Sequence, residues 1–176
     1  MVNKPDFLGG SGQDHSRPEL QVESPETELC LRFYIPLDQE FAILATGIRE
    51  VIELSPDKIT LIPNASALLL GTLNLRGRVI WVADLGQFLR EATALNTNRS
   101  EIPVVVIEEQ DTIVGLAVEK IGAMEWLDVK HLVEPTHVSD TMAPFLRGEW
   151  ILEAQKNQCL RLLDQSAILR STRWAG

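Results

Sequence analysis

The stretch Leu75-Arg76-Gly77-Arg78-Val79-Ile80-Trp81-Val82-Ala83-Asp84 contains two short patterns that recur later in the chain. Its first three residues return as Leu146-Arg147-Gly148, 71 positions downstream. Its last six, five apolar residues followed by an aspartate, resemble residues 159–164, which lie 80 positions downstream. The chain therefore contains traces of an internal repeat.

A third block of similar sequence precedes these two. Residues 47–51 align with residues 117–121, at an offset of 70 positions. Three blocks in the same order indicate two similar units, joined through residues 90–101. The larger offset of the last block predicts an insertion around residues 153–157, where we expect a longer hairpin turn.

Most of the chain after residue 28 is rich in β-branched and aromatic residues, which favour strands. Turn-forming residues separate these runs at intervals of roughly ten residues, a spacing typical of β-sandwiches and barrels. The runs predicted as strands are 29–37, 40–45, 47–54, 78–82, 102–108, 112–118 and 121–127. The sequence therefore predicts an all-β fold built from two small β units.

Three short helices are expected beside the strands. Asp84 and Asp164 each follow an apolar run, and aspartate is a good N-cap residue. Asn64 is a third candidate cap, for a helix that would end before Gly71.

The two ends of the chain differ in composition from its middle. Residues 1–28 combine a Gly-Gly-Ser-Gly stretch with prolines and scattered acids, which predicts a disordered tail. Residues 29–171 form the predicted domain, with its two intertwined units at about 29–90 and 101–171, and residues 172–176 are expected to be a short C-terminal tail. Cys30 and Cys159 lie in apolar runs without a recognisable export signal, so reduced thiols in a cytoplasmic protein are expected.

The charge balance excludes several classes of partner. Acids outnumber bases by 25 to 16, the formal net charge is −9, and no basic run is present. Proteins that bind nucleic acids present clustered Lys and Arg, so a nucleic acid is not an expected partner. A small β-barrel that binds oligonucleotides remains the alternative. It would need a basic groove with stacking aromatic residues, and only 6% of the residues are aromatic.

Asn74-Leu75-Arg76-Gly77 is the most informative short motif. An arginine between apolar runs can be an ordered charge at a protein interface. It can equally be a structural ion pair, with Gly77 supplying a turn or bulge at positive φ. Glu50, in the preceding predicted strand, is the best candidate partner of Arg76. Both roles stay open, and they are compatible.

No catalytic, metal-binding or cofactor-binding motif is recognisable. The chain lacks a nucleotide-binding loop, a GxSxG elbow and an HExxH helix. His131 and His137 flank a predicted turn without a recognised zinc spacing. We therefore expect no enzymatic activity, no metal and no cofactor.

Together these segments resemble the CheW family of chemotaxis coupling proteins. The similar segments are residues 41–43, 47–52, 59–63, 71–85, 103–107, 115–118 and 160–169. The family typically has a proline where this chain has Trp81. The ending Ser171-Thr172-Arg173-Trp174 resembles CheW-like proteins of pilus-driven motility or phototaxis systems.

The resemblance implies a fold and a role. The fold would be two five-stranded β-barrels of the SH3/OB-like kind, with strands exchanged between them. The role would be a non-catalytic adaptor at membrane-associated receptor arrays, without membrane insertion of its own. Its partners would be methyl-accepting chemoreceptors and the regulatory domain of a CheA-type histidine kinase, in chemotaxis, phototaxis or twitching motility. By position, Glu50 and Arg76 match a pair near the receptor-binding groove, and Asn74, Leu75 and Gly77 complete the expected interface.

Overall fold

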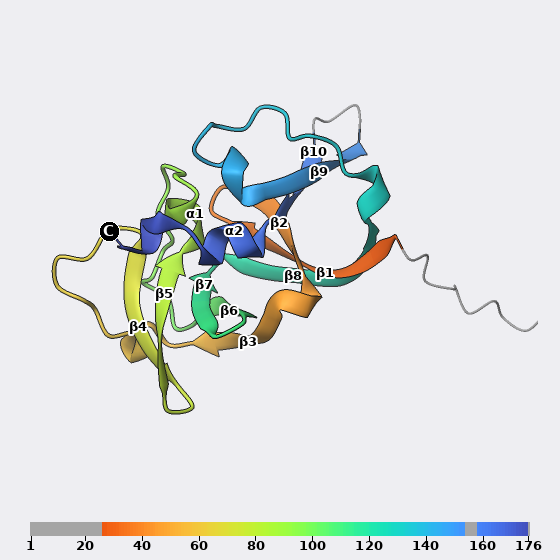
Figure 1. Cartoon of the computed structure of the whole chain (residues 1–176). Helices are drawn as coiled ribbons and strands as arrows, with labels where there is room; N and C mark the ends of the chain where they lie inside the picture. Colours follow the sequence, from red (N-terminus) through yellow and green to blue (C-terminus); the bar gives the residue numbers. More distant parts are fainter. Residues whose placement is uncertain (1–25, 154–157, 176) are drawn as a thin grey trace, which may run out of the picture.

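The computed structural model describes residues 26–153 and 158–175 (Figure 1). Strands form most of this part of the chain, together with short helices. The strands are β1 (Thr27–Ile35), β2 (Gln39–Leu44), β3 (Ile48–Leu54), β4 (Leu69–Leu75), β5 (Arg78–Asp84), β6 (Ile102–Glu109), β7 (Thr112–Ala117), β8 (Lys120–Asp128), β9 (Leu146–Glu153) and β10 (Gln158–Leu163). The α-helices are α1 (Leu85–Phe88) and α2 (Gln165–Leu169), and the 3-10 helices are η1 (Ala45–Gly47), η2 (Pro56–Lys58), η3 (Val129–His131), η4 (Ala143–Phe145) and η5 (Thr172–Ala175).

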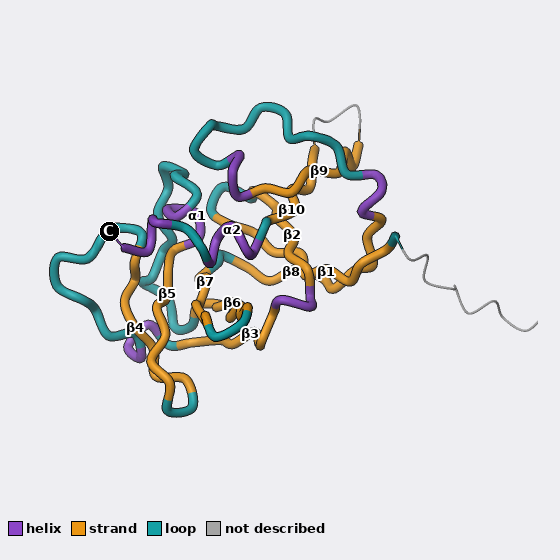
Figure 2. Tube along the Cα trace, in the orientation of Figure 1, coloured by secondary structure: helices purple, strands orange, loops and turns teal. Residues whose placement is uncertain are grey.

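The strands form two five-stranded sheets, which confirms the predicted fold class. Sheet A has the order β8-β1-β2-β10-β9, and sheet B has the order β3-β6-β7-β5-β4. Exchanging each of β1–β5 with the strand numbered five higher converts one order into the other. The two halves of the chain are therefore structural repeats. Each sheet takes two strands from one half of the chain and three from the other (Figure 2). The predicted exchange of strands is therefore confirmed.

Strand pairing defines which residues of the two repeats are equivalent. Ala83 pairs with Leu69 in sheet B, and Leu163 pairs with Leu146 in sheet A. The register then shifts in both sheets, at Gly71 and at Gly148. The residue after each of these glycines forms an isolated bridge: Thr72 pairs with Thr60, and Glu149 pairs with Val133. These bridges are therefore also equivalent in the two repeats.

The alignment of the two Leu-Arg-Gly motifs is therefore wrong. Leu146-Arg147-Gly148 opens β9, and its structural counterpart is Leu69-Leu70-Gly71 at the start of β4. Leu75-Arg76-Gly77 ends β4 and enters the following turn. The two Leu-Arg-Gly motifs match by coincidence, since the register of the sheets places one motif at the start of its strand and the other at the end of the equivalent strand. The expected insertion at 153–157 falls mainly on residues outside the described part.

Each sheet curls into a small barrel, called here barrel A and barrel B after its sheet. Thr60, in the segment that follows the edge strand β3, forms a bridge with Thr72 of the opposite edge strand β4. Val133, in the segment after β8, forms the equivalent bridge with Glu149 of β9. Barrel B encloses a cluster that includes Leu73, Ile80 and Val104, and barrel A encloses one around Trp150.

The largest apolar core lies between the two barrels. Buried residues that contribute to it from sheet A include Phe33, Phe41 and Leu163, and those from sheet B include Val105 and Leu116. Because this shared core exceeds the cluster inside either barrel, separating the barrels would expose the main source of hydrophobic stabilisation. The two barrels fold as one unit.

Two of the three predicted helices are present. The Asp84 carboxylate accepts a hydrogen bond from Gln87 N at 3.3 Å, and Asp164 accepts one from Ala167 N at 3.0 Å. The predicted helix after Asn64 is wrong. Asn64 has φ of 60°, outside the extended region that an N-cap requires, and Leu69 pairs with Ala83 as the first residue of β4.

Both ends of the described part differ from the predicted tails. Residues 1–25 of the predicted disordered tail lie outside the described part, while β1 already begins at Thr27. Residues 172–175, expected to be a tail, form η5 and pack on the domain. Trp174 Nε1 donates a hydrogen bond to Ile168 O, and Arg173 Nη2 donates one to Thr141 O. This segment is therefore integral to the fold.

Candidate interaction site

The hairpin between β4 and β5 carries most of the predicted interface. Arg76 and Gly77 form its two-residue turn, with φ values of 50° and 85°. Positive φ at both central residues is the signature of a type I′ turn, whose twist suits a β-hairpin. Asn74 Oδ1 accepts a hydrogen bond from Gly77 N at 2.9 Å and closes the turn. The predicted structural role of Gly77 at positive φ is confirmed.

Glu50 and Arg76 form the predicted ion pair. Arg76 Nη1 and Nη2 donate to the two carboxylate oxygens of Glu50 at 3.0 and 3.1 Å. Two parallel bonds fix the plane of the guanidinium as well as its position. The structure thereby connects β3 to the turn between β4 and β5.

The burial of this pair differs from the expectation. The strand contexts of both residues predict partial burial, but Arg76 lies in the turn and its side chain is 72% exposed. The Glu50 side chain is 18% exposed. An exposed ion pair typically contributes less than about 1 kcal/mol, so its main effect is to orient Arg76 toward solvent.

We call Glu50, Asn74, Leu75, Arg76 and Gly77 the hairpin site. Asn74, Arg76 and Gly77 are exposed, whereas Leu75 is half-buried and packs on the core of barrel B. The Glu50–Arg76 ion pair and the turn that Asn74 closes connect these residues. The structure therefore brings every predicted interface residue together.

Exposed apolar side chains next to the hairpin site were not predicted as functional. Val79 is 66% exposed and Trp81 is 42% exposed, and both point away from the core residues Ile80 and Val82. Val51, adjacent to Glu50 in β3, is 41% exposed. For Val79 and Trp81, the signal in the sequence is an apolar run in which both alternating faces are hydrophobic, since a strand with one solvent-facing side usually alternates with polar residues.

Buried titratable groups in the described part have structural roles. Burial raises the pKa of the Cys30 thiol to about 11. Burial also raises the pKa of Asp84, against the opposing effect of backbone N–H groups that bind its carboxylate. For Glu149, burial acts to raise the pKa, but hydrogen bonds from Thr136 and the charge of Arg161 hold this pKa below its usual range.

The described residues contain no metal-binding group and no membrane-spanning helix. No cluster of three or more His, Cys, Asp or Glu side chains in ranges 26–153 and 158–175 could hold a metal ion. His131 Nδ1 lies 3.2 Å from Asp128 Oδ2, at the end of β8. Within the same ranges, no helix has the length and apolar character needed to cross a bilayer.

Comparisons with known proteins identify relatives over most of the chain. Residues 31–173 match the family model described as the CheW-like domain. The chain is 32% identical over 129 residues to the chemotaxis protein CheW of Rhizobium meliloti, covering 72% of this chain and 79% of that protein. It is 31% identical over 137 residues to a probable chemotaxis protein CheW of Rhizobium etli, covering 77% and 83%.

A solved structure shows the same fold. The scaffolding protein TtCheW from Thermoanaerobacter tengcongensis superposes with a TM-score of 0.64 at 18% sequence identity. The superposition covers 78% of this chain and 89% of the other.

Proposed function

The chain belongs to the CheW-like domain family, and from this premise we propose that it is a non-catalytic adaptor that couples chemoreceptors to a CheA-type histidine kinase. The observation that carries the proposal is the family match over residues 31–173, which spans both barrels. Relatives named as chemotaxis proteins support the signalling context. Chemotaxis, phototaxis and twitching motility are the systems in which such an adaptor would act.

The hairpin site supplies the contact in this proposal. Glu50 uses both carboxylate oxygens on one edge of the Arg76 guanidinium, and the rest of the exposed side chain stays free to bind a partner. Arginine held in a fixed plane is suited to bind a carboxylate or a backbone carbonyl. Val79 and Trp81 would add apolar contact area beside it, and aromatic and arginine residues are enriched at such interfaces.

Reconstitution tests the adaptor role directly. The purified protein would be combined with receptor-containing membranes and the kinase, and kinase-dependent ATP turnover would be measured. We expect turnover to rise when the adaptor is added and to stay low with Arg76→Ala. Lys58→Ala, which removes another exposed cation from barrel B, is the matched control. Equal turnover with and without the adaptor would contradict the proposal.

Absence of catalysis is a separate expectation. The protein alone, incubated with radiolabelled ATP, should remain unlabelled and release no phosphate. Stoichiometric self-labelling would show that the chain is not a simple adaptor.

A further inference from the structure

The ends of β5 and β10 are built alike in the two barrels. Asp84 N donates to Leu68 O and Asp164 N donates to Phe145 O, both at 2.8 Å. Each aspartate then caps the helix that follows, α1 or α2. The two carboxylates are thus equivalent positions of the internal repeat.

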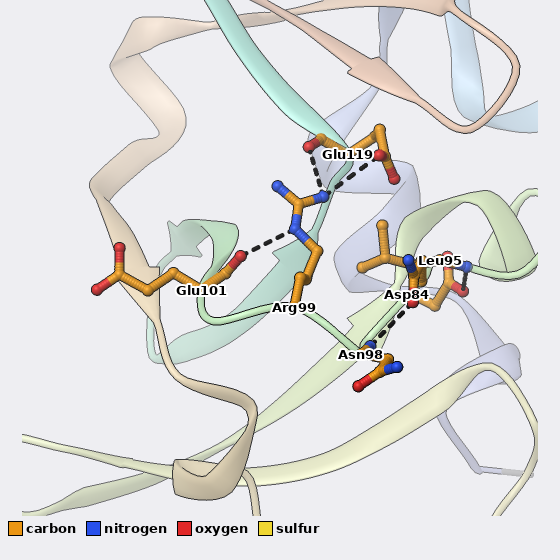
Figure 3. A network of polar contacts seen from close by, with 7 residues as sticks. Asp84, Leu95, Asn98, Arg99, Glu101 and Glu119 are labelled. Carbon is orange, nitrogen blue, oxygen red and sulfur yellow. Dashed lines mark hydrogen bonds and ion pairs between the residues drawn. The ribbon is translucent and has the colours of Figure 1, made fainter.

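In barrel B the chain itself covers this position. Leu95, in the linker after α1, donates its backbone N–H to Asp84 Oδ2 at 2.7 Å (Figure 3). Leu95 is 6% exposed and belongs to the core of barrel B. Farther along the linker, Arg99 Nη1 donates a hydrogen bond to Glu119 O at 3.1 Å. This bond attaches the linker to the segment between β7 and β8.

The backbone after each helix explains why only one barrel is covered. Arg90 has φ of 67°, and Glu91 N donates to Gly86 O at 2.8 Å, an arrangement that reverses the chain toward Asp84. The equivalent residue Arg170 has φ of −89° and leads the chain into η5 instead. Residues 170–175 therefore do not return to Asp164.

An open site remains at the equivalent position of barrel A. It is a cavity of about 370 Å³. Its lining residues are Leu44, Arg147, Leu163, Asp164, Gln165 and Ser166.

The strand registers show how this open site relates to its covered counterpart. They make Leu44 equivalent to Ala117 and Arg147 equivalent to Leu70, and both counterparts pack in the core that holds Leu95. The cavity therefore occupies the place that the linker fills in the other barrel.

We propose that the open site binds an extended segment of a partner protein, in the way that barrel B binds its own linker. The bound segment would donate a backbone N–H to Asp164 and insert a leucine-sized side chain beside Leu44. The inference comes from comparing the two halves of this chain, so it holds independently of the proposed coupling of receptor and kinase.

The open site also indicates the charge of its partner. Arg147 is exposed and forms no hydrogen bond or ion pair with any residue in the described part, whereas its counterpart Leu70 is apolar. Gln165 Oε1 is buried without a hydrogen-bond partner in the same part of the chain. A partner segment with an acidic residue next to its leucine would pair with Arg147, so the site is expected to prefer acidic, leucine-containing peptides.

A peptide copied from the linker tests this proposal. The probe is an acetylated and amidated peptide of residues 91–97 with the change Asn96→Asp, added to the full-length ¹⁵N-labelled protein. We expect the largest chemical-shift changes at the amides of Asp164, Gln165 and Ser166. The peptide with Leu95→Ser should bind about tenfold more weakly or worse, because it lacks the apolar side chain. The peptide that keeps Asn96 should bind more weakly than the probe.

Variants of the protein test whether Arg147 causes the preference for the acidic peptide. Arg147→Ala should abolish the difference in affinity between the acidic probe and the peptide that keeps Asn96, and Lys58→Ala should preserve it. The proposal is overturned by an absence of shifts at the open site, by equal binding of the Leu95→Ser peptide, or by a charge preference that survives Arg147→Ala. Concentration-dependent shifts without peptide would assign the site to a second copy, and contacts from residues 1–25 would assign it to this chain. Either result would also overturn the proposal.

Discussion

Glu50 holds Arg76 through two hydrogen bonds of 3.0 and 3.1 Å, although the two residues are separated by 26 positions. The acid is largely covered, while the arginine keeps 72% of its side chain in solvent. This asymmetry separates the structural effect of the pair from its effect on binding. A variant can lose the oriented guanidinium without exposing the core.

The first prediction concerns the stability of this pair. Arg76→Ala should lower the free energy of unfolding by less than about 1 kcal/mol, because exposed ion pairs contribute little. The cost of roughly 3–5 kcal/mol that applies to a broken buried pair is not expected here. A double-mutant cycle with Glu50→Ala, measured by urea denaturation, should give a coupling energy of about 0.5 kcal/mol. Strictly additive effects would contradict a direct contact.

The second prediction concerns the turn glycine. Gly77→Ala should destabilise the protein by about 1–2 kcal/mol, since Gly77 has φ of 85° and a side chain is strained there. An added Cβ would meet no atom within 4 Å, so the loss is purely conformational. Gly86→Ala in α1 is the control, because it adds a Cβ at ordinary contact distance. Thermal unfolding should show a lower Tm for the first variant and an equal or higher Tm for the second.

The third prediction is a pH dependence that arises from Glu149. Burial acts to raise the pKa of this carboxyl group. Two hydrogen bonds of 2.9 Å from Thr136 to Glu149 Oε1, together with Cys159 and the charge of Arg161, outweigh burial and lower the folded-state pKa. The resulting stability is present above the unfolded-state pKa of about 4.3 and is lost as pH falls through the lower folded-state value. The difference in unfolding free energy between wild type and Glu149→Gln should therefore shrink on acidification.

The fourth prediction tests the C-terminal segment. Trp174 lies 5.2 Å from the ring of Phe88, between centroids, and donates a hydrogen bond to Ile168 O. Trp174→Ala should lower the free energy of unfolding by about 2 kcal/mol, below the cost for a fully buried tryptophan. Thr172→Ala, at an exposed neighbour, should have little effect. Equal stability of the Trp174 variant and wild type would show that this segment is dispensable.

The fifth prediction concerns thiol reactivity. With a pKa of about 11, only about one in a thousand Cys30 thiols is ionised at pH 8. In a Cys159→Ser variant, which isolates Cys30, a thiol reagent should react slowly with native protein and rapidly after unfolding. The reciprocal Cys30→Ser variant reports on the half-buried Cys159. Fast labelling of Cys30 in native protein would contradict its burial.

Local sequence predicted features that depend on neighbouring residues. Asp84 and Asp164 cap short helices as expected, because an N-cap needs only a side-chain oxygen near the first backbone N–H groups. Gly77 adopts positive φ for an equally local reason. The helix expected after Asn64 failed because the pairing of Leu69 with Ala83, a distant contact, takes these residues into β4.

By itself, the sequence determined that the chain is an all-β protein, because apolar alternation and turn residues act over a few positions. The match of residues 79–84 with residues 159–164 also indicated the repeat, since the two segments are equivalent strands. Only the tertiary structure decided which strands share a sheet and that Leu146 corresponds to Leu69. It also decided that Arg76 is exposed and that Asp164 faces an open site while Asp84 is covered by Leu95. These properties depend on contacts between residues far apart in the chain, and the register of strand pairing, which sets those contacts, is established only when the two halves fold around their common core.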